Sequence, residues 1–161
     1  MGTGKSSISK HLSEKTGLKQ ISLDKKIEEI NSKTISEIFA CFDEEYFRKS
    51  ETETLLKVCK EPPAIVDCGG GLPTISVNRD IIRKNGTTIW FKASPTTIYE
   101  RIKYDKSRPL LAGNMSVEYI TEILQKRENA YSVVADIIIE TDNKTIEEIC
   151  SEVLSKLSTL I

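Results

Sequence analysis

Short apolar runs that are typical of strands alternate with longer amphipathic stretches that are typical of helices along the whole chain. Strands are expected over residues 19–23, 64–68, 87–92 and 135–140. Helices are expected around them, over residues 5–16, 43–59, 76–84, 95–102 and 116–129, with short helical turns near 24–30 and 34–39 and a last helix opening at Thr145. This alternation favours an α/β fold, a parallel sheet with helices on both faces, in which ligands bind at the carboxyl ends of the strands.

The length of 161 residues fits one domain with its own core, and we expect residues 1–161 to form it. With 39% hydrophobic and 29% charged residues, the composition is ordinary for a globular protein. The net charge of −1 provides no global field for nucleic acid or an anionic membrane, so neither is expected as a partner. An anionic substrate would have to be held by a few well-placed cations.

Neither a membrane span nor a secretion signal is expected. No apolar run approaches the roughly 20 residues that cross a bilayer, and the N-terminus lacks the basic and apolar regions of a signal peptide. The four cysteines show neither C-x-x-C nor zinc-finger spacing, so free thiols and a cytoplasmic location are expected. His11, the only histidine, falls in the first expected helix, where a surface or packing role is favoured over catalysis.

The motif with the most specific chemistry stands at the start of the chain. Gly4-Lys5-Ser6 matches the last three residues of the phosphate-binding P-loop, G-x-x-x-x-G-K-[ST]. In such a loop backbone N–H groups surround phosphate oxygens, the lysine reaches the β- and γ-phosphates, and the hydroxyl ligates Mg²⁺. The helix that begins at the lysine adds its positive dipole end. A chance match in a flexible N-terminus is the alternative.

Polar and glycine residues follow two of the expected strands. Asp24 could orient or deprotonate a substrate hydroxyl, or it could cap the next helix. The run Gly69-Gly70-Gly71 suggests that the backbone closely approaches a ligand, and a tight structural turn is the alternative.

Three arginines are candidates for binding an anion. Arg48 lies among acidic residues on an expected helix, so its spacing alone favours a solvated helical ion pair, and Arg127 carries the same alternative. Arg108-Pro109 stands in an aperiodic polar segment that suggests a mobile lid, whose cation could stabilise a transferring phosphoryl group. An ordinary surface loop is the alternative there.

Taken together and in order, these stretches resemble shikimate kinase from Met1 to the last helix. The matching stretches are Gly2-Thr3-Gly4-Lys5-Ser6, Leu23-Asp24-x-x-Ile27-Glu28, Ile35-x-Glu37-Ile38-Phe39, Phe47-Arg48-x-x-Glu51, Gly69-Gly70-Gly71, Arg101, Arg108-Pro109-Leu110-Leu111, and Arg127 followed by Tyr131. Each stretch is weak by itself, but the whole set at the spacing of the family is specific.

The resemblance implies transfer of the γ-phosphoryl of ATP to the 3-hydroxyl of shikimate, a step of chorismate and aromatic amino-acid biosynthesis. It further implies that the ATP phosphates and Mg²⁺ are held by the first residues of the chain, with Ser6 as the metal ligand and Lys5 in a catalytic role: Gly2, Thr3, Gly4, Lys5, Ser6 and Ser7. Arg101 would lie against the adenine. Arg108 would reach the phosphates from a lid at about 104–115.

On the substrate side, the resemblance implies that Asp24 binds the reacting hydroxyl and helps to deprotonate or orient it. Arg48 and Arg127 would grip the shikimate carboxylate with their guanidinium forks. The backbone of Gly69, Gly70 and Gly71 would contact the substrate. A monomer is expected.

Three features depart from the family pattern. Ser22 stands where the family usually has the first residue of Asp-x-Asp, so weaker Mg²⁺ binding is expected; Asn129 replaces a common proline, with little expected effect. The first P-loop glycine would precede Met1, and the strand leading into the loop is absent. In the family order 2-3-1-4-5 that strand is the central one, so its neighbours would keep unpaired backbone groups or close the gap. We therefore expect a truncated or mis-started version of a longer protein.

Two other functions stay open at this point. One is another small-metabolite P-loop kinase, such as a gluconate kinase, although the arginines and the glycine run suit a carboxylated ring better. The other is a non-catalytic homologue, which the incomplete P-loop and Ser22 would favour.

Overall fold

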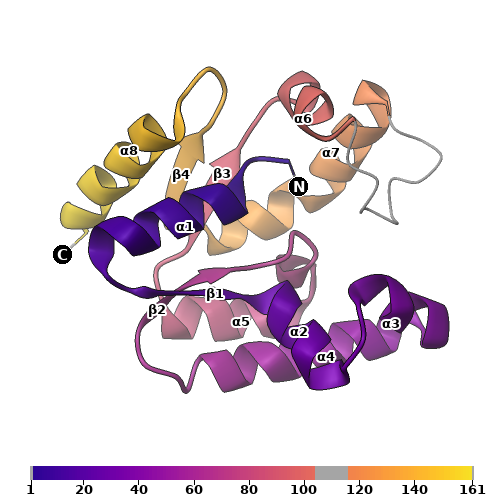
Figure 1. Cartoon of the computed structure of the whole chain (residues 1–161). Coiled ribbons are helices and arrows are strands. Elements are labelled where there is room, and N and C mark those ends of the chain that lie inside the picture. The colour runs from indigo at the N-terminus through magenta and orange to yellow at the C-terminus, as the bar shows by residue number, and fades with distance from the viewer. Residues whose placement is uncertain (1, 104–115, 161) are drawn as a thin grey trace. The chain divides into compact units, whose positions relative to one another are not determined.

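The structure, a computed structural model, describes residues 2–103 and 116–160 (Figure 1). Its elements follow one another as α1 (Lys5–Thr16), β1 (Lys19–Ser22), α2 (Leu23–Asn31), α3 (Ile35–Cys41), α4 (Glu44–Val58), β2 (Ala64–Asp67), η1 (Leu72–Thr74), α5 (Ser76–Asn85), β3 (Ile89–Lys92), α6 (Pro95–Ile102), α7 (Val117–Val134), β4 (Ile137–Glu140) and α8 (Ile146–Ser158). Strands and helices alternate as expected. The expected lid at about 104–115, with Arg108, lies outside the described residues.

The strands of the described residues pair in parallel, in two separate two-stranded sheets. β1 pairs with β2, with Lys19 opposite Ala64, and β3 pairs with β4, with Ile89 opposite Ile137. These two pairs agree with the neighbours 2-3 and 4-5 in the strand order that the family resemblance implies. The prediction of a parallel α/β fold is therefore confirmed, and within the described ranges β2 and β3 do not pair with each other.

Contacts divide the chain into two compact units. The central unit is Ser9–Gly86 and carries α2 to α5 with β1 and β2; the terminal unit is Met1–Ile8 with Thr87–Ile161 and carries β3, β4 and α6 to α8. The division falls inside α1, whose first turn belongs to the terminal unit. The expectation of one domain over residues 1–161 stays a prediction.

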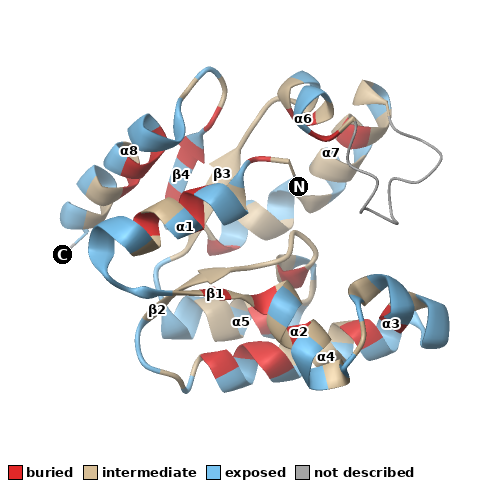
Figure 2. Ribbon diagram, viewed as in Figure 1, coloured by how far each residue is buried: buried red, intermediate tan, exposed pale blue. Residues whose placement is uncertain are grey.

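Each unit has an apolar core (Figure 2). In the central unit, β1, η1 and the inner faces of α2, α3 and α4 bury Ile21, Leu23, Ile27, Ile38, Phe47, Leu55, Val58 and Leu72. In the terminal unit, α6 and α7 bury Ile98, Ile102 and Ile120. Burying a side chain of this size stabilises a fold by about 1.5–3 kcal/mol, so these clusters fix the helices that carry the candidate site residues.

Most helix starts are fixed by local side chains. At the N-termini of α2, α3, α4, α6, α7 and α8 a side-chain oxygen accepts a backbone N–H of the first turn, and the capping residues are Ser22, Thr34, Asp43, Ser94, Ser116 and Thr145. α3 and α8 have complete capping boxes, in which Glu37 and Glu148 accept from the backbone N–H of Thr34 and Thr145. The helical turn expected near 34–39 is confirmed as α3.

We expect acid to unfold the first turns of α3 and α8. Backbone and hydroxyl hydrogen bonds from Thr34 and Thr145 lower the pKa of Glu37 and of Glu148. Because the folded pKa lies below the unfolded value of about 4.3, the stabilisation is complete above that pH and is lost as the pH falls through the folded pKa. Far-UV circular dichroism should show that the unmodified chain loses helix as the pH is lowered from about 6 to about 2. The loss should be smaller in a variant that carries both Glu37→Gln and Glu148→Gln. An unchanged pH profile in that variant would contradict the assignment.

The boundaries of several helices and strands differ from those predicted from the sequence. α7 continues to Val134 instead of ending near Asn129. β3 begins two residues later than expected, because the N–H of Thr88 is held by the carboxylate of Asp136 at 2.7 Å, outside the strand pairing. Trp90 on β3 is half-buried, and its ring lies against that of Tyr131 with 5.4 Å between the ring centroids.

Candidate active site

The central unit brings together Asp24, Arg48, Gly69 and Gly71, four residues that the sequence analysis placed in the substrate site. Asp24 lies in the first turn of α2, Arg48 in the second turn of α4, and the glycines between β2 and η1. The glycines follow the carboxyl end of β2, as expected for a ligand site in a parallel α/β fold.

Arg48 is held by two carboxylates of its own helix. Its Nη1 donates to Oε2 of Glu51 at 2.7 Å, and its Nε and Nη2 donate to Oε1 of Glu44 at 3.1 and 2.9 Å. The side chains of Arg48 and Glu51 are only 19% and 2% exposed, whereas that of Glu44 is 69% exposed. Burial by itself lowers the pKa of Arg48, but the hydrogen bonds and charges of Glu51 and Glu44 outweigh it and raise the pKa above its ordinary value. The spacing correctly indicated ion pairs, but the Arg48–Glu51 pair is not a solvated one.

Because the residues of the glycine run have no side chains, the side chains of Arg48 and Asp24 can lie close to its backbone. A Cβ on Gly71 would overlap Nη1 of Arg48 and would stand 3.1 Å from its Cζ, so the guanidinium lies directly against this backbone. A Cβ on Gly69 would stand 3.0 Å from Oδ1 of Asp24 and 3.5 Å from Oε1 of Glu51. The turn is also structural, since the N–H of Leu72 donates to the carbonyl of Gly69 and the N–H of Thr74 to that of Gly71. The structural turn is therefore present, and the approach of this backbone to a ligand stays a prediction.

Asp24 does not cap the following helix. The N-cap of α2 is Ser22, whose hydroxyl accepts the N–H of Lys25 at 3.4 Å. Asp24 is instead the second residue of the helix, half-buried beside Gly69. The capping alternative for Asp24 is wrong, and its carboxylate lies where the chain turns from β1 into α2.

The phosphate-loop residues Gly2 to Ser7 belong to the terminal unit. Gly2 and Gly4 have φ of +64° and +86°, a left-handed backbone that glycine adopts at no steric cost. Lys5 is the first residue of α1, and Ser6 and Ser7 are exposed on its first turn. The positive end of the α1 dipole therefore lies at the residues that match the motif, as an anion site requires.

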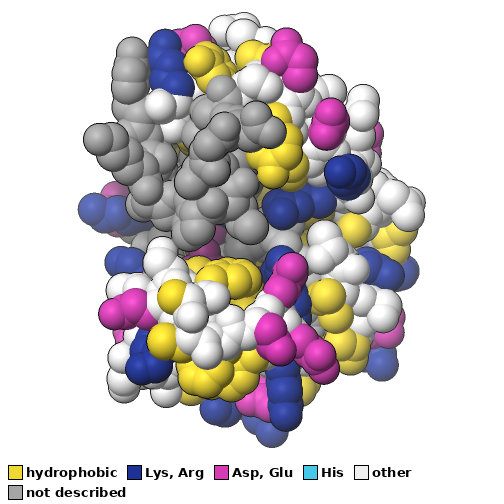
Figure 3. Space-filling view, turned by 90° about the vertical axis from the view of Figure 1, so that its right-hand side faces the viewer, with side chains coloured by type: hydrophobic (Ala, Val, Ile, Leu, Met, Phe, Trp, Pro, Cys, Tyr) yellow, Lys and Arg dark blue, Asp and Glu magenta, His cyan; other side chains and the backbone are white. Residues whose placement is uncertain are grey.

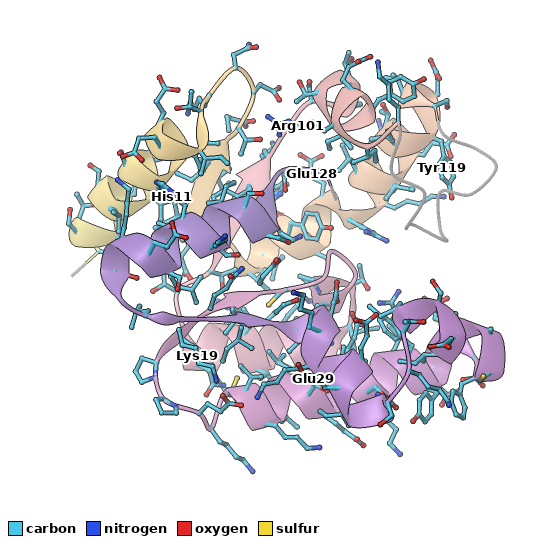
Figure 4. All side chains as sticks on the ribbon, viewed as in Figure 1. His11, Lys19, Glu29, Arg101, Tyr119 and Glu128 are labelled. Atoms are coloured by element: carbon cyan, nitrogen blue, oxygen red, sulfur yellow. The ribbon has the colours of Figure 1, made fainter. Side chains whose placement is uncertain are left out.

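Arg101 extends from α6 toward the phosphate loop and the end of β4 (Figure 4). Its Nη2 donates to the carbonyl of Thr141 at 3.0 Å and its Nη1 to the Thr141 hydroxyl at 3.2 Å, with a long contact of 3.5 Å to the carbonyl of Gly2. A Cβ on Gly2 would stand 3.1 Å from Ile102, so this glycine is packed onto α6. Arg101 and the loop thus lie together.

The remaining residues that were considered are Arg127, His11 and the four cysteines. Arg127 is half-buried on α7 of the terminal unit. His11 lies 3.8 Å from Glu14 on α1. The four cysteines are free, as expected, and burial raises the pKa of the Cys59 thiol.

The structure adds side chains that the sequence analysis did not assign to the site. Glu44 and Glu51 stand four residues before and three after Arg48, a helical spacing that could have identified them as its partners. Asn78 and Thr141 are fully buried polar residues that contact site segments distant in sequence, and no local pattern marks them.

The surface charges are mixed. On the face drawn in Figure 3, lysine and arginine side chains are interspersed with carboxylates and do not gather into one basic patch. Where the chain is described, no helix combines the length and the apolar composition that a membrane crossing requires.

A family model described as shikimate kinase matches residues 1–158 of this chain. A shikimate kinase of Dehalococcoides mccartyi is 39% identical over 98% of this chain and 89% of the relative, and one of Sulfurihydrogenibium is 36% identical over 98% and 93%. A solved structure described as shikimate kinase from Acinetobacter baumannii in complex with shikimate is 28% identical, with a TM-score of 0.92 over 99% of this chain and 89% of that one. A gluconokinase from Sinorhizobium meliloti, at 19% identity and a TM-score of 0.70, shares the fold. The extent of the family match and these identities show that the chain belongs to the shikimate kinase family.

Proposed function

We propose that this chain transfers the γ-phosphoryl group of ATP to the 3-hydroxyl of shikimate. The observation that carries the proposal is the guanidinium of Arg48, which lies against the backbone of Gly71 near Asp24 and Gly69. A buried arginine offers a planar set of donors to a carboxylate, and a neighbouring carboxylate offers an acceptor to a hydroxyl. Shikimate carries both groups.

On the substrate side, Arg48 would bind the ring carboxylate together with Arg127, and Glu51 would keep the guanidinium in place. Asp24 would accept the proton of the reacting hydroxyl or orient that hydroxyl for in-line attack. The backbone of Gly69 to Gly71 would contact the ring. Because Gly69 and Gly71 have no Cβ, the side chains of Asp24 and Arg48 can lie directly beside this backbone. Phosphoryl transfer depends mostly on such positioning and on charge stabilisation.

On the nucleotide side, the N–H groups of Gly2 to Ser7 and the Lys5 ammonium would surround the ATP phosphates, with Arg101 toward the adenine. Arg108 would add a cation to the transferring group. Ser6 would ligate Mg²⁺, which would bridge and neutralise the phosphates. The hydroxyl is exposed at the start of α1, and Mg²⁺ usually takes only one or two protein ligands beside phosphates and water. No group of three or more His, Cys, Asp or Glu side chains among the described residues offers another metal site.

The proposal extends to the setting of the reaction. Use of ATP supports a cytoplasmic location, and the product would feed chorismate and aromatic amino-acid synthesis. The expectation of a monomer also belongs to this proposal.

The direct test is ADP formation by the purified chain with Mg²⁺ and ATP, with shikimate or gluconate as the acceptor. We expect ADP formation to depend on shikimate and to stop when Mg²⁺ is chelated, with kcat/KM for gluconate at least about 100-fold lower. Equal activity on gluconate would contradict the assigned substrate. Calorimetric binding of shikimate without turnover would favour the non-catalytic homologue instead.

A further inference from the structure

We infer that Asn78 is a positioning residue for the shikimate site, because it holds the turn that carries Gly71 at a fixed distance from the helix that carries Arg48. The inference rests on the proposed function, since it assigns the Arg48–Gly71 contact to the substrate carboxylate. It concerns a residue that does not itself touch the substrate in this assignment.

Asn78 lies on α5 and is 0% exposed. Its Nδ2 donates to the carbonyl of Leu72 at 3.1 Å, and its Oδ1 accepts from the hydroxyl of Thr52 at 2.8 Å. The single hydrogen of that hydroxyl is shared with the carbonyl of Arg48, at 3.1 Å. The carbonyl of Leu72 can only accept a hydrogen bond, so the amide nitrogen must face it and the amide oxygen must face Thr52. The side chain therefore forms a bridge with one defined orientation.

The two ends of this bridge adjoin the two halves of the carboxylate site. Leu72 directly follows Gly71, and Thr52 stands one helical turn after Arg48 on α4. The guanidinium of Arg48 fits against Gly71 with no room for a Cβ. A small change in the separation of α4 and the turn would therefore open or close the contact, and Asn78 links these two segments directly.

The alternative is that Asn78 only stabilises the fold, because a buried amide that keeps both hydrogen bonds also contributes to stability. The two roles differ in what they change. Replacing a residue that only stabilises the fold lowers the melting temperature and affects the KM values of both substrates alike. Replacing a positioning residue raises the KM for shikimate and leaves the KM for ATP unchanged.

The test uses Asn78→Ala, Thr52→Val and their combination, with KM for each substrate and melting temperature measured for every variant. We expect the KM for shikimate to rise about fivefold or more in each single variant and the KM for ATP to stay within about twofold. The double variant should resemble Asn78→Ala, because both changes break the same bridge. Thr52→Ser keeps the hydroxyl, so its KM for shikimate should equal that of the unmodified chain.

Val58→Ala is the matched control. Val58 is buried on the same helix, ten residues and about 15 Å along the axis from Arg48, and its truncation should lower the melting temperature without changing either KM. The inference is overturned if the Asn78 and Thr52 variants change both KM values together, or neither, or if Val58→Ala gives the same shift. If Asn78→Ala does not fold, Thr52→Val and Thr52→Ser decide by the same criteria. Absence of shikimate turnover in the unmodified chain would instead refute the proposed function, and the inference with it.

Discussion

Replacing Gly71 by alanine is expected to raise the KM for shikimate by about 10- to 100-fold while the chain still folds. The backbone of Gly71, at φ −85° and ψ −21°, suits any residue, so the change introduces no backbone strain. The new methyl group would occupy the place of Nη1 of Arg48, and Glu51 and Glu44 restrain the guanidinium from the other side. A charge-assisted hydrogen bond contributes about 1.5–3 kcal/mol, which corresponds to the stated loss of affinity.

The matched control for this variant is Gly86→Ala. Gly86 has an extended backbone with φ of 177°, and a Cβ there would meet no atom within 4 Å. Steady-state kinetics should show unchanged KM values for this variant. If Gly71→Ala also kept the KM for shikimate, the Arg48–Gly71 contact could not be the carboxylate site.

Replacing Asp24 by asparagine is expected to lower kcat by about 10²- to 10⁴-fold, the usual contribution of a general base. The amide has nearly the same shape and can still bind a hydroxyl, but it cannot take up the proton. The KM for ATP should change little, because Asp24 belongs to the substrate side of the proposed site. Single-turnover phosphoryl transfer at saturating shikimate would measure the chemical step directly.

Glu29→Gln is the control for lost charge. Glu29 lies on the same helix as Asp24 and is exposed (Figure 4), so its neutralisation removes the same charge without touching the site. Its kcat should equal that of the unmodified chain. A nearly normal kcat in Asp24→Asn would restrict Asp24 to orienting the hydroxyl.

The parts of the fold that could be predicted from the sequence are those with local causes. α1 was predicted with its bounds, because the glycine at position 17, with φ of +71°, ends it. The starts of the helices expected at 34–39 and 95–102 also have local causes, the capping box at Thr34 and the N-cap at Ser94. By contrast, no residue near Asn129 stops α7, and the helix ends only where Ala135 becomes extended ahead of β4.

The same distinction between local and long-range causes applies to the candidate site. Residue type and position made Asp24 and the glycine run candidates, and the family resemblance implied the role of Arg48. Neither indicated their mutual contacts, which join segments more than 20 residues apart. Whether Asp24 would serve the substrate or cap α2 was left open, because its side chain suits both roles, and Ser22 was not considered as the cap. Asn78 was not recognised, since a single asparagine on an amphipathic helix is ordinary until Leu72 and Thr52 are seen around it.

The division into two units has a consequence for the order in which the chain folds during its synthesis. The central unit is one continuous segment, so all of its contacts can form once Gly86 has left the ribosome. The phosphate-loop residues are made earlier, yet they belong to a unit whose other elements begin only at Thr87. Closing that long interval costs chain entropy, and α6, which contacts Gly2, is translated later. The phosphate-loop residues are synthesised before the central unit and are nevertheless expected to become ordered after it.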